Sequence, residues 1–338
     1  MSTSSTSSKG AKTTANTVGT SGTGQDALNF GITEDLGNGM TAFADINYVV
    51  ATGTNGSTPS QDNGSGIGLK SASMGKIFLG NSYNQIWFTM NMADASGWGA
   101  GKMGSVWGAT NGAAGSVENN SNAIVYTFPT LTEGLDIIVE GRYGNTSTGT
   151  ADSTGAGISY TNGALSAKYA YNKKNLSTAS TTTYTQTYSN LTTSTVVATT
   201  SYTSAFSSYD ALGTATAGTS DGATSLVTQA IALTYDFGIA KAFYGNQTQL
   251  GNNGSTIAEN KHTYGITVPF GATTIGYAHS SAEFTNGSDA TTKLTGDKII
   301  ARYALSKRTN VYASYGKTAT DGATTALSNT SLGLFHSF

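Results

Sequence analysis

Apolar and polar side chains alternate along most of the chain, in segments of roughly ten residues. In the segment 41–50, Ile46 and Tyr48 fall on one face of an extended strand and Asp45 falls on the other. The same period of two recurs in the segments 227–235, 264–270 and 298–305. Because successive side chains of a strand point to opposite faces of a sheet, each segment predicts a β-strand with one apolar face.

The connections between these segments are alternately short and long. The short ones carry Gly or Asn where a tight turn needs positive φ, or form a compact polar turn: 35–39, 74–75, 162–163, 236–238, 270–271 and 306–309. The long ones fall at about 51–65, 83–121, 144–154, 174–224, 249–261, 281–293 and 317–327. Short turns at one end and long loops at the other are typical of outer-membrane barrels. We therefore predict an all-β fold, a transmembrane antiparallel β-barrel.

About fifteen strands are readable after Leu28, whereas single-chain bacterial barrels have even strand numbers, so we expect sixteen. Residues 1–26 are rich in Ser, Thr and Gly and predict a flexible N-terminal segment, followed by the barrel over 27–338. The missing strand has three explanations: a poor strand hidden in residues 1–26, an absent first strand, or one wrong assignment.

Composition narrows the class of protein. Charged residues make up 11% of the 338 residues, about half the share usual for soluble proteins. No apolar run approaches the ~20 residues of a membrane helix, and no secretory signal is visible, so we expect export to have removed one. The absence of cysteine excludes disulfide and thiol chemistry. A net charge of −2 argues against a nucleic-acid partner.

Several stretches resemble the trimeric general porins of β-proteobacteria, the group of the Neisseria, Burkholderia and Comamonas porins. They are 31–39 (GITEDLGNG), 122–129 (NAIVYTFP), 235–238 (YDFG), 305–309 (LSKRT) and the end, 333–338 (GLFHSF). The chain departs from this family in two ways. Residues 1–26 lack the family's apolar–aromatic opening strand, and only three arginines are present: Arg142, Arg302 and Arg308.

This resemblance implies a homotrimeric integral protein of the Gram-negative outer membrane, with lipid and lipopolysaccharide as partners. It implies a water-filled channel for passive diffusion of small hydrophilic solutes and ions, with no cofactor and no metal. By the same resemblance, residues 83–121 fold into the barrel as the constriction loop, where the alternative is an exposed surface loop. The candidate constriction residues are Trp87, Asp94, Trp98, Lys102, Trp107 and Glu118. The terminal pattern Leu334, His336, Phe338 resembles the family's assembly signal, where the alternative is an ordinary last strand.

The alternation also assigns charged residues to the polar, lumen-facing side of the strands. These predicted pore-lining residues are Asp45, Lys70, Lys76, Glu140, Arg142, Lys168, Lys298 and Arg302. Six are basic and two are acidic, and rings of charge set the ion preference of a pore. We therefore expect a weak anion preference; the alternative is a solvated wall with no net bias.

Tyrosines gather near strand ends and predict the aromatic girdles of a barrel; a soluble sheet with cross-strand aromatic packing is the alternative. They are Tyr48, Tyr143, Tyr160, Tyr169, Tyr171, Tyr235, Tyr244, Tyr264, Tyr277, Tyr303, Tyr312 and Tyr315. The three histidines lie in separate strands, His279 and His336 on the apolar side, with no metal-ligand spacing or nucleophile motif, so we do not expect an enzyme. Two other functions stay open: a surface-layer or adhesin-type extracellular β protein, and a substrate-specific channel of the same fold.

Overall fold

The computed structural model describes residues 2–8, 11–17, 27–50, 60–61, 64–96, 119–144, 152–175, 225–251, 258–285, 291–320 and 325–337. Its elements, in chain order, are β1 (Ser2–Ser8), β2 (Ala11–Thr17), β3 (Ala27–Gly37), β4 (Met40–Val49), β5 (Ser60–Gln61), β6 (Ser65–Ser71), β7 (Gly75–Tyr83), α1 (Gln85–Met92), β8 (Asn119–Thr127), β9 (Leu135–Arg142), β10 (Ser153–Asn162), β11 (Leu165–Asn175), β12 (Ser225–Asp236), β13 (Lys241–Gly251), β14 (Ala258–Phe270), β15 (Thr273–Thr285), β16 (Thr291–Ala304), β17 (Thr309–Thr320) and β18 (Thr325–His336). Within these ranges no helix has the length and apolar character needed to cross a membrane.

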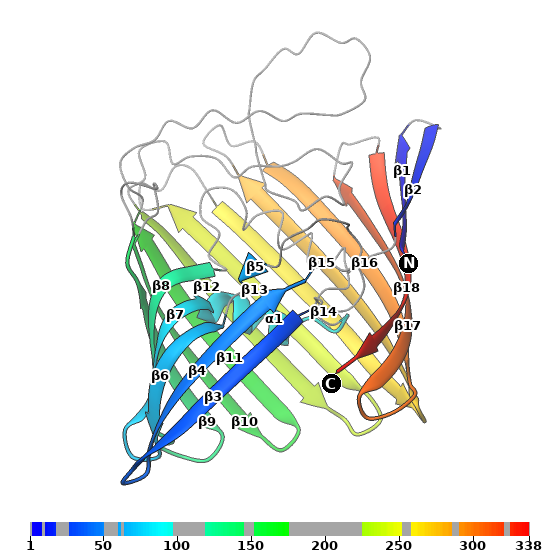
Figure 1. Ribbon diagram of the computed structural model, residues 1–338. Coiled ribbons are helices and arrows are strands. Elements are labelled where there is room, and N and C mark those ends of the chain that lie inside the picture. The colour runs from blue at the N-terminus through cyan, green and yellow to red at the C-terminus, as the bar shows by residue number, and fades with distance from the viewer. Residues whose placement is uncertain are drawn as a thin grey trace.

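The strands form one antiparallel sheet in which neighbours along the chain are neighbours in space. Each strand from β6 to β18 pairs with the next, and β4 pairs with β3 on one edge and with β5 and β6 on the other. The sheet curves into a barrel wall, and the short turns lie together at one end of it (Figure 1). The predicted fold class is confirmed.

The strand count also agrees with the sequence. Fifteen strands of seven or more residues lie between Ala27 and His336, and the two-residue β5 adds only a short extension beside β4. Residues 1–26 contain the hairpin β1–β2, and β1 pairs with the upper half of β18. This pairing favours the explanation that the N-terminal segment hides a strand. No register in the described residues joins β3 to β1, β2 or β18, so the described wall has two ends. The flexibility expected of residues 1–26 stays a prediction.

The two faces of the wall differ in the way that the alternation predicts. On β12, Ile231 and Leu233 are exposed, whereas Ala230 and Ala232, which alternate with them, are buried. The buried face is the inner one, because Ala230 packs against α1, which lies inside the curve of the strands (Figure 1). The exposed large apolar side chains of β12 therefore point outward, as they do where a barrel meets lipid.

The short turns close as their residue types require. Asn38 has a φ of 52° between two glycines, and Gly37 N–H donates to the Asp35 carboxylate over 2.9 Å. Gly238 has a φ of 80°, and its N–H donates to Asp236 over 2.7 Å. Residues other than Gly and Asn rarely adopt these positive φ angles, so the turn positions predicted from the sequence have a direct steric cause.

Outward tyrosines form two belts on the β10–β17 side of the wall. One belt lies within a few residues of the short turns and the other lies higher, where the register pairs Tyr244 with Tyr264 and Ile299 with Tyr315. The outward, exposed members of the two belts are Tyr160, Tyr235 and Tyr303 below and Tyr169, Tyr244, Tyr264, Tyr277 and Tyr315 above. Eight of the twelve tyrosines predicted for the girdles lie in these belts, with an apolar band between them. The prediction is wrong for Tyr312, which is the register partner of Arg302 and is buried on the inner face.

Candidate pore and constriction

The connection after β7 turns into the barrel. The helix α1 begins at the N-cap Asn84, whose side-chain oxygen accepts a hydrogen bond from Trp87 N over 2.9 Å. Figure 1 shows α1 lying inside the wall, in front of β12 and β13. Ile86 and Met90 form a buried cluster with Ala170 of β11 and Ala230 of β12. The inward fold predicted for the constriction loop is therefore observed for residues 84–96, the described part of that loop before β8.

Small residues on the inner wall allow this close approach. A Cβ atom added to Gly157 of β10 would lie 2.9 Å from the Gln85 side chain. A Cβ atom on Gly245 of β13 would lie 2.6 Å from the Ala93 Cβ, and one on Gly265 of β14 would lie 2.5 Å from the Ala95 Cβ. Real Cβ contacts are not this short, so larger residues on this track would push the loop off the wall.

Polar contacts fasten both ends of the inward segment. At the N-terminus of α1, Gln85 N donates to the Glu140 carboxylate of β9 over 3.0 Å. At the other end, Arg302 Nη2 of β16 donates to the Ser96 carbonyl over 2.7 Å, a bond between residues 206 positions apart. Asp94 accepts from both Ser96 N and Ser96 Oγ, which holds this turn in shape.

These contacts change the interpretation of three predicted pore-lining residues. All eight lie on the inner face, as the alternation predicts, but Glu140 is 6% exposed and Lys298 only 1% exposed. Asp94 lies close enough to Lys298 and Arg302 to attract both electrostatically. Glu140 and Arg302 therefore hydrogen-bond to the inward segment, and Lys298 lies buried near Asp94 of that segment.

The other five predicted residues lie where solvent reaches them. Lys70 of β6 and Lys76 of β7 are register partners on the inner face, both exposed, and Lys76 Nζ lies 4.7 Å from the centre of the Phe43 ring. Asp45, Arg142 and Lys168 are half-buried. Their contact with passing solute stays a prediction.

Further charged residues, not predicted from the sequence, lie on the inner face near the long connections. Lys174 lies on β11, and its register joins it through Ser153 to Arg142, in one row across three strands. Lys261 lies on β14 and is buried. Both lysines fall in predicted loops, because the strands extend further than their apolar residues indicate. Asp136 of β9 and Lys241 of β13 share the inner face by the same alternation.

The candidate constriction residues divide between described and undescribed parts of the chain. Trp87 lies on α1 with its ring stacked on Tyr83, the centroids 3.9 Å apart, and Asp94 lies in the turn after α1. Trp98, Lys102, Trp107 and Glu118 lie outside the described residues. Of the candidate assembly signal, Leu334 and His336 lie exposed on β18 and Phe338 lies outside the described residues, so that role stays a prediction.

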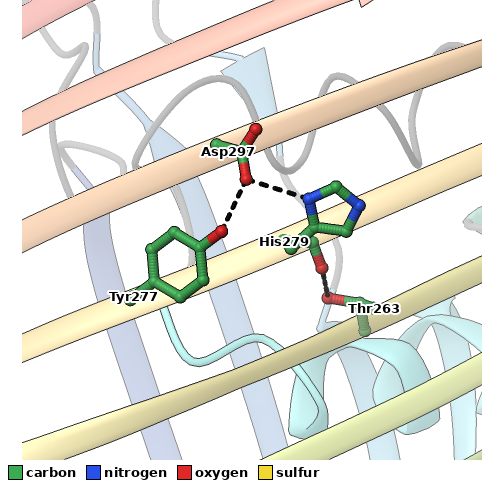
Figure 2. A network of polar contacts seen from close by, with 4 residues as sticks. All are labelled: Thr263, Tyr277, His279 and Asp297. Atoms are coloured by element: carbon green, nitrogen blue, oxygen red, sulfur yellow. Dashed lines mark hydrogen bonds and ion pairs between the residues drawn. The ribbon is translucent and has the colours of Figure 1, made fainter.

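His279 lies on the outer face, as predicted, within a small polar network (Figure 2). Asp297 of β16 accepts a 2.6 Å hydrogen bond from the Tyr277 hydroxyl, and the same oxygen lies 2.9 Å from His279 Nδ1. Thr263 Oγ1 donates to the His279 carbonyl over 3.1 Å. The side chains of Tyr277, His279 and Asp297 satisfy one another at the upper tyrosine belt and face away from the lumen, whereas Thr263 reaches the His279 carbonyl from the inner face. Within the described ranges, no group of three His, Asp or Glu side chains could hold a metal ion.

Comparison with known proteins agrees with this architecture. The family model described as Gram-negative porin matches residues 2–323. A search of the curated proteins found no match. Among solved structures, the anion-selective porin from Comamonas acidovorans is 19% identical, with 99% of this chain and 97% of that chain covered and a TM-score of 0.73.

Two further solved structures share the fold at lower identity. OmpT of Vibrio cholerae in its trimer form is 11% identical over 99% of this chain and 96% of that chain, with a TM-score of 0.63. OmpF of Salmonella typhi, in complex with daunomycin, is 13% identical over 99% of this chain and 96% of that chain, with a TM-score of 0.64.

Proposed function

The chain belongs to the Gram-negative porin family, and from this premise we propose a homotrimeric outer-membrane channel with a weak preference for anions. Membership in this family makes it an outer-membrane β-barrel and a channel for passive diffusion of small hydrophilic solutes and ions. The finer parts of the proposal are the charge preference, the trimer, the contact with lipid and lipopolysaccharide, and the absence of enzymatic activity.

The observation that carries the charge preference is an excess of basic side chains on the inner face. The described basic residues there are Lys70, Lys76, Arg142, Lys168, Lys174, Lys241, Lys261, Lys298 and Arg302. The described acidic residues on the same face, or on the segment folded against it, are fewer: Asp35, Asp45, Asp94, Asp136, Glu140 and Asp236. A lumen narrowed by α1 brings solute close to these charges, and field lines concentrate in a low-dielectric channel. The solved porin from Comamonas acidovorans that shares this fold is itself anion-selective.

The trimer is supported by relatives and by the outer face. OmpT of Vibrio cholerae has a trimer form. On the β3–β9 side, the outward residues are largely aliphatic, including Ile32, Ile67, Leu79 and Val139, whereas the β10–β17 side carries the two tyrosine belts. An aliphatic side without a full set of headgroup-level tyrosines fits a surface that meets another protein subunit better than one that meets lipid headgroups.

The structure bears differently on the two alternative functions, the adhesin and the substrate-specific channel. A soluble adhesin has no need for an outward apolar band between two tyrosine belts, and this band favours the channel. A substrate-specific channel would share the wall and differ only in the lining of the lumen.

Reversal potentials of the reconstituted protein in a KCl gradient test the charge preference. A potential that reports a higher permeability for chloride than for potassium is expected, and a clear cation preference would contradict it. Migration on a gel before and after heating tests the barrel and the trimer together. We expect a fast or oligomeric band that converts to the 34.5 kDa chain on boiling.

A further inference from the structure

One side of α1 faces the lumen with aromatic rings. Gln85, Ile86, Thr89 and Met90 are the buried residues of the helix and face the wall. At 100° per residue, Trp87, Phe88 and Asn91 lie on the opposite side. Phe88 is 39% exposed. Large apolar surface left open to water is costly, and it marks binding sites more often than chance positions.

The three rings pack together in one cluster. Tyr83, at the end of β7, stacks on Trp87 with a centroid distance of 3.9 Å and an interplanar angle of 12°. Phe88 meets both rings by its edge, at 5.1 Å from Trp87 and 6.3 Å from Tyr83. Because β7 and α1 hold the three rings at fixed spacing, a planar ligand would find a preorganised stacking surface there.

Positive charge borders this surface. Lys168 Nζ of β11 lies 5.3 Å from the centre of the Phe88 ring. Above the helix, Arg142 and Lys174 lie in one row across β9–β11. The same patch of wall carries two carboxylates near Lys168, Asp136 and Glu140, so the three cations exceed them by one.

We propose that Tyr83, Trp87 and Phe88 form a stacking subsite within the pore for planar aromatic carboxylates, with the carboxylate directed toward Lys168. This inference rests on the proposed channel function and adds a solute class to it. The ring stacks on the aromatic faces, and the ammonium offers charge-assisted hydrogen bonds to the carboxylate. A saturated ring of the same size lacks the π-face, and a neutral ring lacks the charge, so both should bind more weakly.

Channel currents in planar bilayers measure the subsite in the full-length protein. Benzoate added to symmetric KCl is expected to reduce the chloride current in a saturable way. Cyclohexanecarboxylate, acetate and benzyl alcohol serve as probes without the π-face, without the ring and without the charge. Equal inhibition by benzoate and cyclohexanecarboxylate would overturn the stacking role, and equal inhibition by benzoate and benzyl alcohol would overturn the role of Lys168.

Variants assign the effect to the named residues. Trp87→Leu and Phe88→Leu should each raise the half-inhibiting benzoate concentration about three- to tenfold, the range expected for one aromatic pair. Trp87→Phe, which keeps a ring, should recover most of the affinity, and Lys168→Met should lose it while keeping the packing on Phe88. Phe270→Leu on the outer face is the matched control and should leave inhibition unchanged. Unaltered inhibition in both leucine variants would refute the subsite.

A second measurement separates this inference from the channel function itself. Benzoate titrated against the protein in detergent micelles should change the tryptophan fluorescence excited at long wavelength, and Trp87→Phe should remove part of that change. Binding in micelles without conductance in bilayers would support the subsite and contradict the channel. Conductance without binding in either assay would leave the channel standing and overturn the subsite.

Discussion

Glycines make room for different neighbours in two parts of the inner wall, although both parts are built from the same kinds of strand. On the covered wall, β10–β16, glycines such as Gly245 and Gly265 make room for the segment that folds into the lumen. On the open wall, β3–β8, a Cβ added to Gly68 would meet the Phe43 ring at 2.3 Å, and one added to Gly66 would meet the Phe78 ring at 2.5 Å. There the glycines make room for side chains of the wall itself.

The difference shows that the lumen is shaped in two independent ways. On the covered wall, the shape depends on contact with a distant segment, and charges such as Lys298 are buried beneath it. On the open wall, Phe43 and Phe78 stack with ring centroids 6.4 Å apart, and Lys70 and Lys76 remain in solvent. Changes to the covered wall should therefore alter pore size, and changes to the open wall should alter charge selectivity.

The largest expected effect comes from filling the glycine track. Gly245→Val should destabilise the fold by about 1–3 kcal/mol and lower the single-channel conductance, because the added methyls push Ala93 and its neighbours into the lumen. Gly141→Val on β9 is the matched control, since a Cβ there meets nothing within 4 Å. The measurements are the temperature of gel-band conversion and single-channel conductance. A normal conductance in Gly245→Val would show that the track does not set pore size.

The second-largest effect is expected from removing the Arg302 side chain, which bonds to the end of the inward segment. Arg302→Met leaves the Ser96 carbonyl without its donor in a buried position, at a cost of about 1–3 kcal/mol. We expect noisier open-channel currents, because one end of the inward segment is released. Lys76→Met, on the open wall, removes a cation without touching that segment and should leave the noise unchanged. Equal noise in the two variants would contradict the anchoring role.

A smaller effect is expected for charge reversal on the open wall. Lys70→Glu should move the reversal potential toward cations with little change in conductance, because Lys70 is exposed and does not contact α1. Lys317→Glu reverses a charge that lies on the outer face by the alternation of β17, so it should leave the reversal potential unchanged. If both variants shift the potential equally, selectivity does not arise from the inner face.

The smallest effect is the salt dependence of that shift. The Debye length falls from about 10 Å at 0.1 M to about 3 Å at 1 M, so exposed charges are screened and buried ones much less. The selectivity difference between Lys70→Met and the unmodified protein should shrink across this range of KCl concentration. A difference that persists at 1 M would indicate that solute passes in direct contact with Lys70.

The face on which a strand residue lies could be predicted from the sequence, whereas its contacts with distant residues could not. The alternation placed Asp45, Lys168 and Arg302 on the correct face, because the face of a strand residue depends only on its neighbours two positions away. The role of Arg302 depends on Ser96, more than two hundred positions earlier, and no local pattern reports such a contact. The aromatic surface was missed because Tyr83 and Phe88 meet Trp87 only after β7 ends and α1 begins.

The sequence by itself determined the antiparallel wall, its apolar outer face, its tyrosine belts and the end that carries the short turns. Each of these depends on a period of two or on the φ angles of Gly and Asn, which are properties of a few adjacent residues. Only the tertiary structure decided which inner residues meet solvent and which lie under α1. An inner position can face either water or protein, and the choice depends on where a distant segment of the chain packs.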